Sequence, residues 1–89
     1  MLKPVFTSKF KKDFQKVAAQ GKDMTKIDTV MIDLEEGNAL EPQHKVHSLT
    51  GNFAGRRECH ITPDWLLVYK IEDETIVFER TGSHSEIFK

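Results

Sequence analysis

Apolar residues recur every three or four positions in two successive segments of the first half of the chain, as is typical of amphipathic helices. The first segment follows Ser8, a candidate N-cap, and ends at Gly21. The second follows Asp23 or Thr25 and ends at Gly37. The apolar positions are Phe10, Phe14, Val17 and Ala18 in the first segment, and Met24, Ile27, Val30, Met31 and Leu34 in the second. The short linker between them predicts an antiparallel helix pair.

Strand-like patterns flank this helix pair. A short strand is predicted at 3–7, and three more at about 54–61, 65–72 and 75–80, with a turn at 72–74 joining the last two. The stretch 38–52 is polar and predicts a long loop, and the tail from 83 onward is at most one helical turn. The sequence therefore predicts one α+β domain over residues 1–89: an N-terminal strand and a two-helix antiparallel hairpin packed on a mainly antiparallel sheet of about four strands.

The segment 54–61 alternates between two sets of side chains. Cys59 and Ile61 share one parity with Arg57, whereas Glu58 and His60 share the other with Arg56. We expect the polar set to face away from the helices, because successive side chains of a strand point to opposite faces of the sheet. The next two strands are apolar on both parities, so the pattern does not orient them.

Charge is distributed unevenly along the chain, and this bears on whether the protein binds nucleic acid. The net charge is −1, with 38% hydrophobic and 30% charged residues, an ordinary soluble mix. Seven lysines and three aspartates make residues 1–30 basic, whereas residues 31–89 are acidic. A nucleic-acid function would rest on a local patch, for which Lys9, Lys12 and Lys16 are candidates, and the alternative is a solvated helix face.

No apolar run is long enough to span a bilayer, and no secretory signal is visible at the N-terminus, so we expect no membrane partner. The single cysteine, Cys59, excludes an internal disulfide and suits a reducing, cytoplasmic setting. Its alternation with Ile61 favours core packing over nucleophilic catalysis. A zinc site is disfavoured because Cys59 and His60 are adjacent on a strand and point to opposite faces. We expect neither a metal nor a cofactor.

The four histidines all lie in or beside the loop-and-sheet part of the chain, and histidines gathered at one site suit proton transfer near neutral pH. They are His44, His47, His60 and His84, and His44 is interpreted as a surface residue or a hydrogen-bonded structural one. Asp64 follows a proline turn, where it either closes the turn or orients a histidine. Trp65 is either a core residue or a ring for base stacking. Arg80 is either a surface residue or a phosphate ligand, and Phe88 either fills the core or stacks on a base.

Several motifs together resemble the YafQ-type branch of the RelE/ParE toxin superfamily. They are His47 to Gly51, the block Gly55 to Ile61, the block Pro63 to Tyr69, and Arg80 to Phe88 with the sequence RTGSHSEIF. The resemblance covers nearly the whole chain, and it implies the RelE-like fold. It also implies the toxin of a bacterial toxin–antitoxin operon, an endoribonuclease that cleaves mRNA in the ribosomal A site without a metal. A small antitoxin from the adjacent gene is the implied protein partner.

Family catalytic positions carry over where the motifs match. They are His47, Glu58, His60, Asp64, Arg80, His84 and Phe88, where Glu58 matches a position that holds Asp or Glu in relatives. RNA can be cut by attack of its own 2′-OH on the adjacent phosphate, which needs a base, an acid and positive charge. We interpret His84 as the acid, and His60, Asp64 or His47 as the base or its orienter. Two alternatives remain open: a gyrase-targeting relative on the same fold, and an inactive homologue that only binds an antitoxin.

Overall fold

The computed structural model describes residues 1–88 as one sheet with helices on both faces. The sheet has five strands in the order β1-β5-β4-β3-β2. The strands are β1 (Lys3–Phe6), β2 (His47–Ser48), β3 (Arg57–Thr62), β4 (Trp65–Glu72) and β5 (Thr75–Gly82). The helices are α1 (Ser8–Ala19), α2 (Met24–Glu35) and α3 (His84–Ile87), with 3₁₀ turns at Pro42–His44 and Gly51–Phe53. The α+β class is confirmed, and the sheet has one strand more than expected.

The extra strand, β2, lies inside the segment expected to be a loop. It has only two residues, and these pair antiparallel with β3. Two residues are too few to show any alternation, which is why the pattern gave no sign of this strand. At the other edge, β1 pairs parallel with β5, and the β3–β4–β5 meander is antiparallel as expected.

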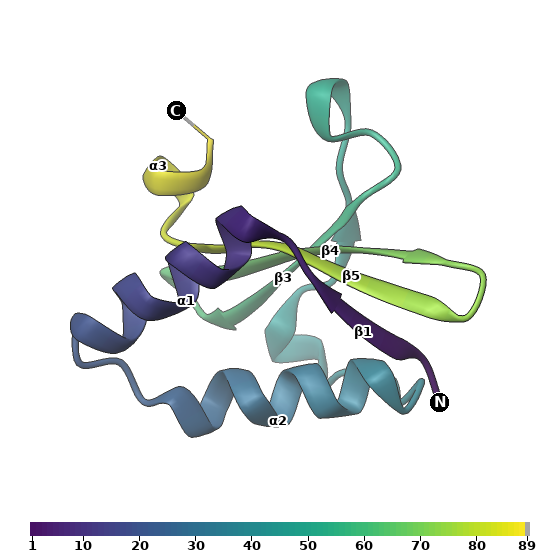
Figure 1. The fold of residues 1–89 in the computed structure, drawn as a ribbon, viewed down its shortest axis with the longest axis horizontal. Coiled ribbons are helices and arrows are strands. Elements are labelled where there is room, and N and C mark those ends of the chain that lie inside the picture. The colour runs from purple at the N-terminus through teal and green to yellow at the C-terminus, as the bar shows by residue number, and fades with distance from the viewer. Residues whose placement is uncertain (89) are drawn as a thin grey trace.

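Both long helices begin close to where the sequence places them. Thr7, one residue before the expected Ser8, caps α1, because its side chain accepts a hydrogen bond from the backbone N–H of Phe10. Asp23 caps α2 by accepting from the N–H of Thr25. Gly21 follows α1 with a φ of +82°, a conformation that favours glycine. The two helices run in opposite directions along one side of the sheet (Figure 1).

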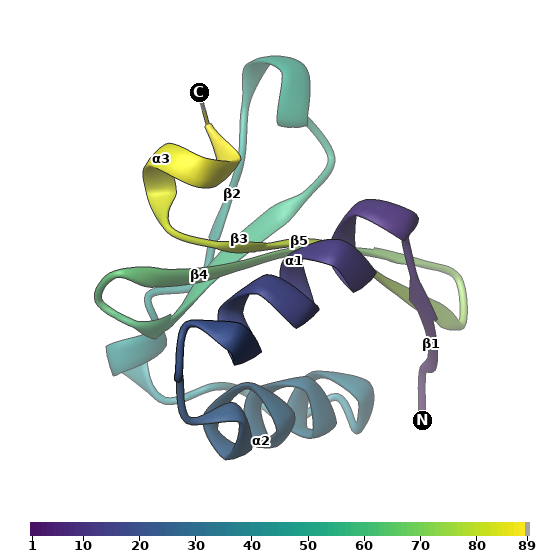
Figure 2. The same ribbon diagram turned by 60° about the vertical axis from the view of Figure 1, so that its left-hand side comes forward.

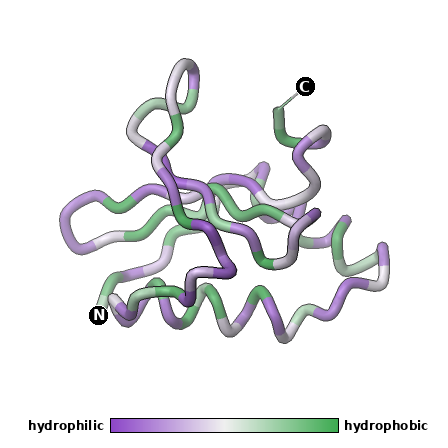
Figure 3. Tube along the Cα trace, turned by 180° about the vertical axis from the view of Figure 1, so that it is seen from behind, coloured by the Kyte–Doolittle hydropathy of each residue, from purple (hydrophilic) through white to green (hydrophobic). Residues whose placement is uncertain are grey.

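The main core lies between these two helices and the sheet. It contains Phe10 and Val17 of α1, four residues of α2, and alternate residues of β3, β4 and β5, among them Cys59, Leu67 and Phe78. Figure 3 shows hydrophobic residues along the central strands and the long helices, whereas the α1–α2 and β4–β5 turns are hydrophilic. Within residues 1–88, no helix is long and apolar enough to cross a membrane.

The opposite face of the sheet is covered only in part. A small cluster of Leu66, Val68 and Ile87 lies there, with Phe53 and Phe88 packed against it. These aromatic residues come from the second 3₁₀ turn and from the residue that follows α3, two segments that stand side by side on the face away from α2 (Figure 2). The rest of this face carries the polar side chains that build the site.

Candidate active site

Glu58 and His60 lie on the sheet face opposite the helix pair, as the alternation in β3 predicts. Their neighbours Cys59 and Ile61 are buried in the helix-side core. Glu58 is only 6% exposed, and it lies directly opposite His47 in the β2–β3 pairing. Its carboxylate Oε2 lies 2.8 Å from Nε2 of His47. A nearly buried carboxylate needs a partner, and His47 supplies one.

The two ring nitrogens of His47 both face oxygen acceptors. Nε2 faces Glu58, and Nδ1 lies 3.0 Å from the carbonyl oxygen of Lys45. A neutral imidazole can donate only one of these hydrogen bonds, whereas an imidazolium donates both. Both ring nitrogens of His47 are therefore engaged by contacts within the chain.

His60 is oriented differently from His47. Its Nδ1 lies 3.3 Å from the carbonyl oxygen of Pro63, in the turn between β3 and β4. With the proton on Nδ1 donated to this carbonyl, Nε2 keeps its lone pair and faces the open side of the sheet. Glu58 Oε2 is 3.9 Å from that Nε2, close enough for its charge to stabilise an imidazolium there. In this tautomer Nε2 is able to accept a proton.

His44 supports this arrangement, although the sequence assigned it no catalytic role. Its Nδ1 is 2.6 Å from the carbonyl oxygen of His60. The contact ties the first 3₁₀ turn to β3 and fixes the strand that carries Glu58 and His60. Its sequence separation of 16 residues lies beyond the reach of any local pattern.

His84 and Phe88 lie on the short helix α3 and just after it. The centroids of their rings are 5.0 Å apart, and His84 is exposed. Its imidazole makes no hydrogen bond with any of residues 1–88. A helix of four residues is not stable alone, so its position depends on contacts with the rest of the chain.

Glu86 supplies most of these contacts. Its carboxylate accepts the backbone N–H of Ser83 at 2.8 Å and pairs with Lys16 of α1 at 2.7 Å, while Ser83 caps the N–H of Glu86 in return. The hydrogen bond from Lys16, followed by those from Ser83, lowers the pKa of Glu86 to about 2. Gly82 directly precedes Ser83 and has a φ of +147°. A Cβ at Gly82 would lie 3.0 Å from Oε1 of Glu86, so the position favours glycine. α3 is thus attached to α1 through one carboxylate.

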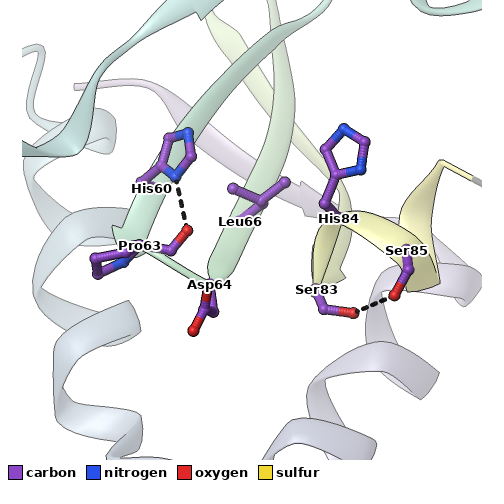
Figure 4. A pocket seen from close by; sticks show the side chains of 7 residues that line it. All are labelled: His60, Pro63, Asp64, Leu66, Ser83, His84 and Ser85. Atoms are coloured by element: carbon purple, nitrogen blue, oxygen red, sulfur yellow. Dashed lines mark hydrogen bonds between the residues drawn. The ribbon is translucent and has the colours of Figure 1, made fainter.

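A pocket of about 500 Å³ lies between β3 and α3 (Figure 4). His60 and His84 project on the same side of the sheet, one to each side of Leu66, and Ser83 and Ser85 line the α3 wall. Asp64 lines the pocket from the β3–β4 turn, and its carboxyl points away from both imidazoles (Figure 4). The pocket therefore offers two histidines to one ligand, with a carboxylate at its rim.

Arg80 does not line this pocket. Its Nε donates to Oδ2 of Asp13 on α1 at 2.7 Å, and the same oxygen accepts the backbone N–H of Thr81. The guanidinium borders a neighbouring hollow together with Lys9 and Lys12. Lys16, by contrast, is engaged with Glu86. The expected basic patch is thus divided between two lysines beside Arg80 and one that holds α3.

Of the two alternatives for Trp65, the structure favours the core residue over a ring that stacks on RNA. The side chain is 2% exposed within the helix-side core, and its indole N–H donates to the hydroxyl of Thr81 at 2.9 Å. The apolar pattern of β4 on both parities hid which way this ring points. Cys59 is a core residue as expected, and burial raises the pKa of its thiol to about 12, so it is no nucleophile.

Two residues that position the site were missed by the sequence. Asp13 holds Arg80, and Glu86 holds α3. Asp13 acts across the fold, 67 residues from Arg80, so no local motif indicates it. Glu86 also reaches Gln20, 66 residues away, but its contact with Ser83 is a Ser-x-x-Glu capping box that the sequence could have shown. Among residues 1–88, no group of three or more histidine, cysteine or acidic side chains is placed to hold a metal ion.

Comparisons with known proteins agree with this architecture. The "mRNA interferase toxin YafQ" of Escherichia coli K12 is 36% identical over 84 residues, which span 93% of this chain and 91% of that protein. A copper-bound mutant toxin from Helicobacter pylori superposes with a TM-score of 0.94 at 41% identity, over 99% of this chain and all of that one. The toxin of the E. coli DinJ–YafQ complex gives 0.90 at 34% identity, over 99% of this chain and 98% of that one.

The match to a family is equally extensive. Residues 2–89 match the family described as "Bacterial toxin of type II toxin-antitoxin system, YafQ". The match includes every strand and helix and all of the pocket residues described above. The chain belongs to the YafQ family of bacterial type II toxins.

Proposed function

We propose that this chain is an mRNA interferase, an endoribonuclease that cleaves mRNA by metal-independent acid–base catalysis and so inhibits translation. The observation that carries the proposal is the pocket in which His60 of β3 and His84 of α3 face one space. Membership of the YafQ family and the name of the E. coli relative support the choice of substrate.

In the first half of the proposed reaction, Nε2 of His60 removes the proton from a ribose 2′-OH. The 2′ oxygen then attacks the adjacent phosphorus. The contact of Nδ1 with Pro63 keeps the lone pair on Nε2, and Glu58 stabilises the imidazolium that forms. His47 contacts Glu58 on its other side and holds the carboxylate in place.

In the second half, the bond from phosphorus to the 5′ oxygen breaks, and His84 gives that oxygen a proton. His84 suits this role because it is exposed on the opposite wall of the pocket from His60. The products are a 2′,3′-cyclic phosphate and a 5′-hydroxyl, so protons and bonds balance without a metal. Phe88, in ring contact with His84, positions the nucleotide, and Asp64 borders the pocket as a candidate orienter.

Arg80 supplies positive charge for the pentavalent transition state. Asp13 holds its Nε at 2.7 Å and one terminal nitrogen at 3.4 Å, which leaves the other terminal nitrogen for a phosphate. Arg80 lies outside the histidine pocket, in a hollow that it borders with Lys9 and Lys12. For Arg80 to contact the scissile phosphate, the RNA must extend from the pocket to this hollow. These lysines add attraction for the backbone phosphates.

The proposal extends to two partners. The relative solved in the DinJ–YafQ complex supports a cognate antitoxin encoded beside this chain. We also propose that cleavage takes place in the A site of the small ribosomal subunit and that the protein acts in the cytoplasm.

The experiment is a cleavage assay with mRNA alone in excess EDTA and, separately, with mRNA on ribosomes in the Mg²⁺ that keeps the ribosome assembled. We expect cleavage to persist after chelation and the products to end in cyclic phosphate and 5′-hydroxyl. A 2′-deoxy substitution at the cut site should abolish cleavage. Co-purified antitoxin should suppress cleavage. A wild-type protein that cuts no RNA in either setting, or that relaxes or traps DNA with gyrase instead, would refute the proposal.

A further inference from the structure

A row of aromatic rings extends from the histidine pocket across the open face of the sheet. The ring of Phe88 lies 5.0 Å from that of His84 on one side and 5.0 Å from that of Phe53 on the other. Phe53 belongs to the 3₁₀ turn Gly51–Phe53, which stands beside α3 (Figure 2). It is half-buried, so part of its surface remains open.

Beyond Phe53 the row ends in a second hollow of about 200 Å³. Its walls carry three cationic side chains, from Lys9, Arg56 and Arg80, against the single carboxylate of Glu79, with Asn52 and Phe53 beside them. The volume is below the range of about 300–1,000 Å³ typical of sites for drug-sized ligands. It suits one phosphate or one base rather than a larger molecule.

The two arginines are held by acidic partners in a similar way. Nε of Arg56 donates to Oε1 of Glu79 at 2.6 Å, as Nε of Arg80 donates to Asp13. Each guanidinium is therefore oriented through Nε. One terminal nitrogen of Arg56 makes a long contact of 3.4 Å with the carbonyl oxygen of Ala54. An oriented guanidinium with terminal N–H groups to spare is suited to a phosphate. Lys9 is exposed and forms no ion pair within residues 1–88.

We propose that Phe53, Arg56 and Lys9 form a second RNA subsite, which binds a nucleotide beyond the two that flank the scissile phosphate in the histidine pocket. Phe53 packs against its base, Arg56 and Lys9 bind its phosphate, and Phe88 separates it from that pair. Stacking on aromatic rings beside a cationic groove is the general mode of single-strand binding. The inference rests on the proposed ribonuclease function, and it adds a determinant of RNA length and path that lies outside the proton-transfer groups.

The test measures affinity for oligoribonucleotides of increasing length, made uncleavable by 2′-deoxy substitution. We expect the wild-type protein to bind a hexanucleotide more tightly than a dinucleotide because the longer strand also fills the second subsite. The variants are Phe53→Leu, which keeps apolar packing but removes the ring, and Arg56→Gln. Arg57→Gln is the matched control, because it removes the same charge from an exposed residue that does not line the hollow.

Phe53→Leu should weaken hexanucleotide binding roughly tenfold and leave dinucleotide binding unchanged. Arg56→Gln should reduce the slope of log K against log salt by about 0.7, the value for one phosphate of a single strand. The control should match wild type in both measurements. Equal losses for the two lengths, or hexanucleotide affinity unchanged in both variants, would overturn the subsite. Intact length-dependent binding by a wild-type protein that cuts no RNA would instead count against the proposed function alone.

Discussion

The two faces of the sheet differ in what their residues do, even where those residues are neighbours in the chain. Cys59, on the helix side, is fully buried, and its thiol has a pKa raised to about 12. Glu58 and His60, on either side of it in sequence, form an ionisable pair on the open face. One strand thus contributes to the core with one set of side chains and to the site with the other. Function can be altered on one face with little change in stability.

The helix-side face carries most of the folding free energy. Its cluster joins both long helices to three strands, and Phe78 is completely buried at its centre, in contact with Phe6 and Phe10. The open face has only three buried apolar residues, together with aromatic residues from two short segments. The site face therefore depends on specific hydrogen bonds and ion pairs, such as those of Glu58 and Glu86, more than on apolar burial.

The largest effect is expected on the helix side. Phe78→Ala should lower the free energy of unfolding by about 3–5 kcal/mol, because it removes a buried ring and leaves a cavity. Urea unfolding followed by circular dichroism measures this. RNA cleavage, expressed per folded molecule, should stay within about threefold of wild type. A loss of stability below 1 kcal/mol would show that this face is not the principal core.

At Glu58 we expect a smaller effect, which falls on the cleavage rate and leaves stability almost unchanged. Glu58→Gln keeps the shape and a hydrogen-bond acceptor for His47 but removes the charge beside Nε2 of His60. We expect single-turnover cleavage to fall roughly tenfold, equivalent to about 1.4 kcal/mol of transition-state stabilisation. Thermal unfolding of the same preparation is the control, and it should change by only a few degrees. If unfolding alone accounts for the lost rate, Glu58 is a structural residue.

The sequence predicted the strand alternation well and the long-range contacts poorly. The parity of Glu58 and His60 followed from β3 alone, because Cys59 and Ile61 are apolar and must be buried. Trp65 could not be oriented, since both faces of β4 are apolar. The attachment of Arg80 to Asp13 depends on α1 lying beside β5, which no local pattern encodes. Family resemblance supplied a set of candidate site residues, but not which of them line one pocket, as His60, Asp64 and His84 do.

The smallest effect is expected where α3 meets α1. The pKa of Glu86 is lowered from 4.5 to about 2 in the folded protein, so its ion pair stabilises the fold above pH 4.5 and is lost as the pH falls toward 2. In Glu86→Gln this contribution is absent at every pH. Because the pair with Lys16 is exposed, we expect the two proteins to differ by less than about 1 kcal/mol at pH 7 and to converge near pH 2. Urea unfolding across this range measures the difference, and a constant gap would contradict the assignment.

The most direct test of the account is single-turnover cleavage by His84→Ala, with the free energy of unfolding measured on the same preparation. His84 is exposed on the open face, so its truncation should leave no cavity in either apolar cluster. We predict a loss of roughly 10²–10⁴ in rate, as expected for removal of a general acid, at unchanged stability. A folded His84→Ala protein that cleaves RNA at the wild-type rate would contradict the claim that the open face carries out the chemistry through this histidine.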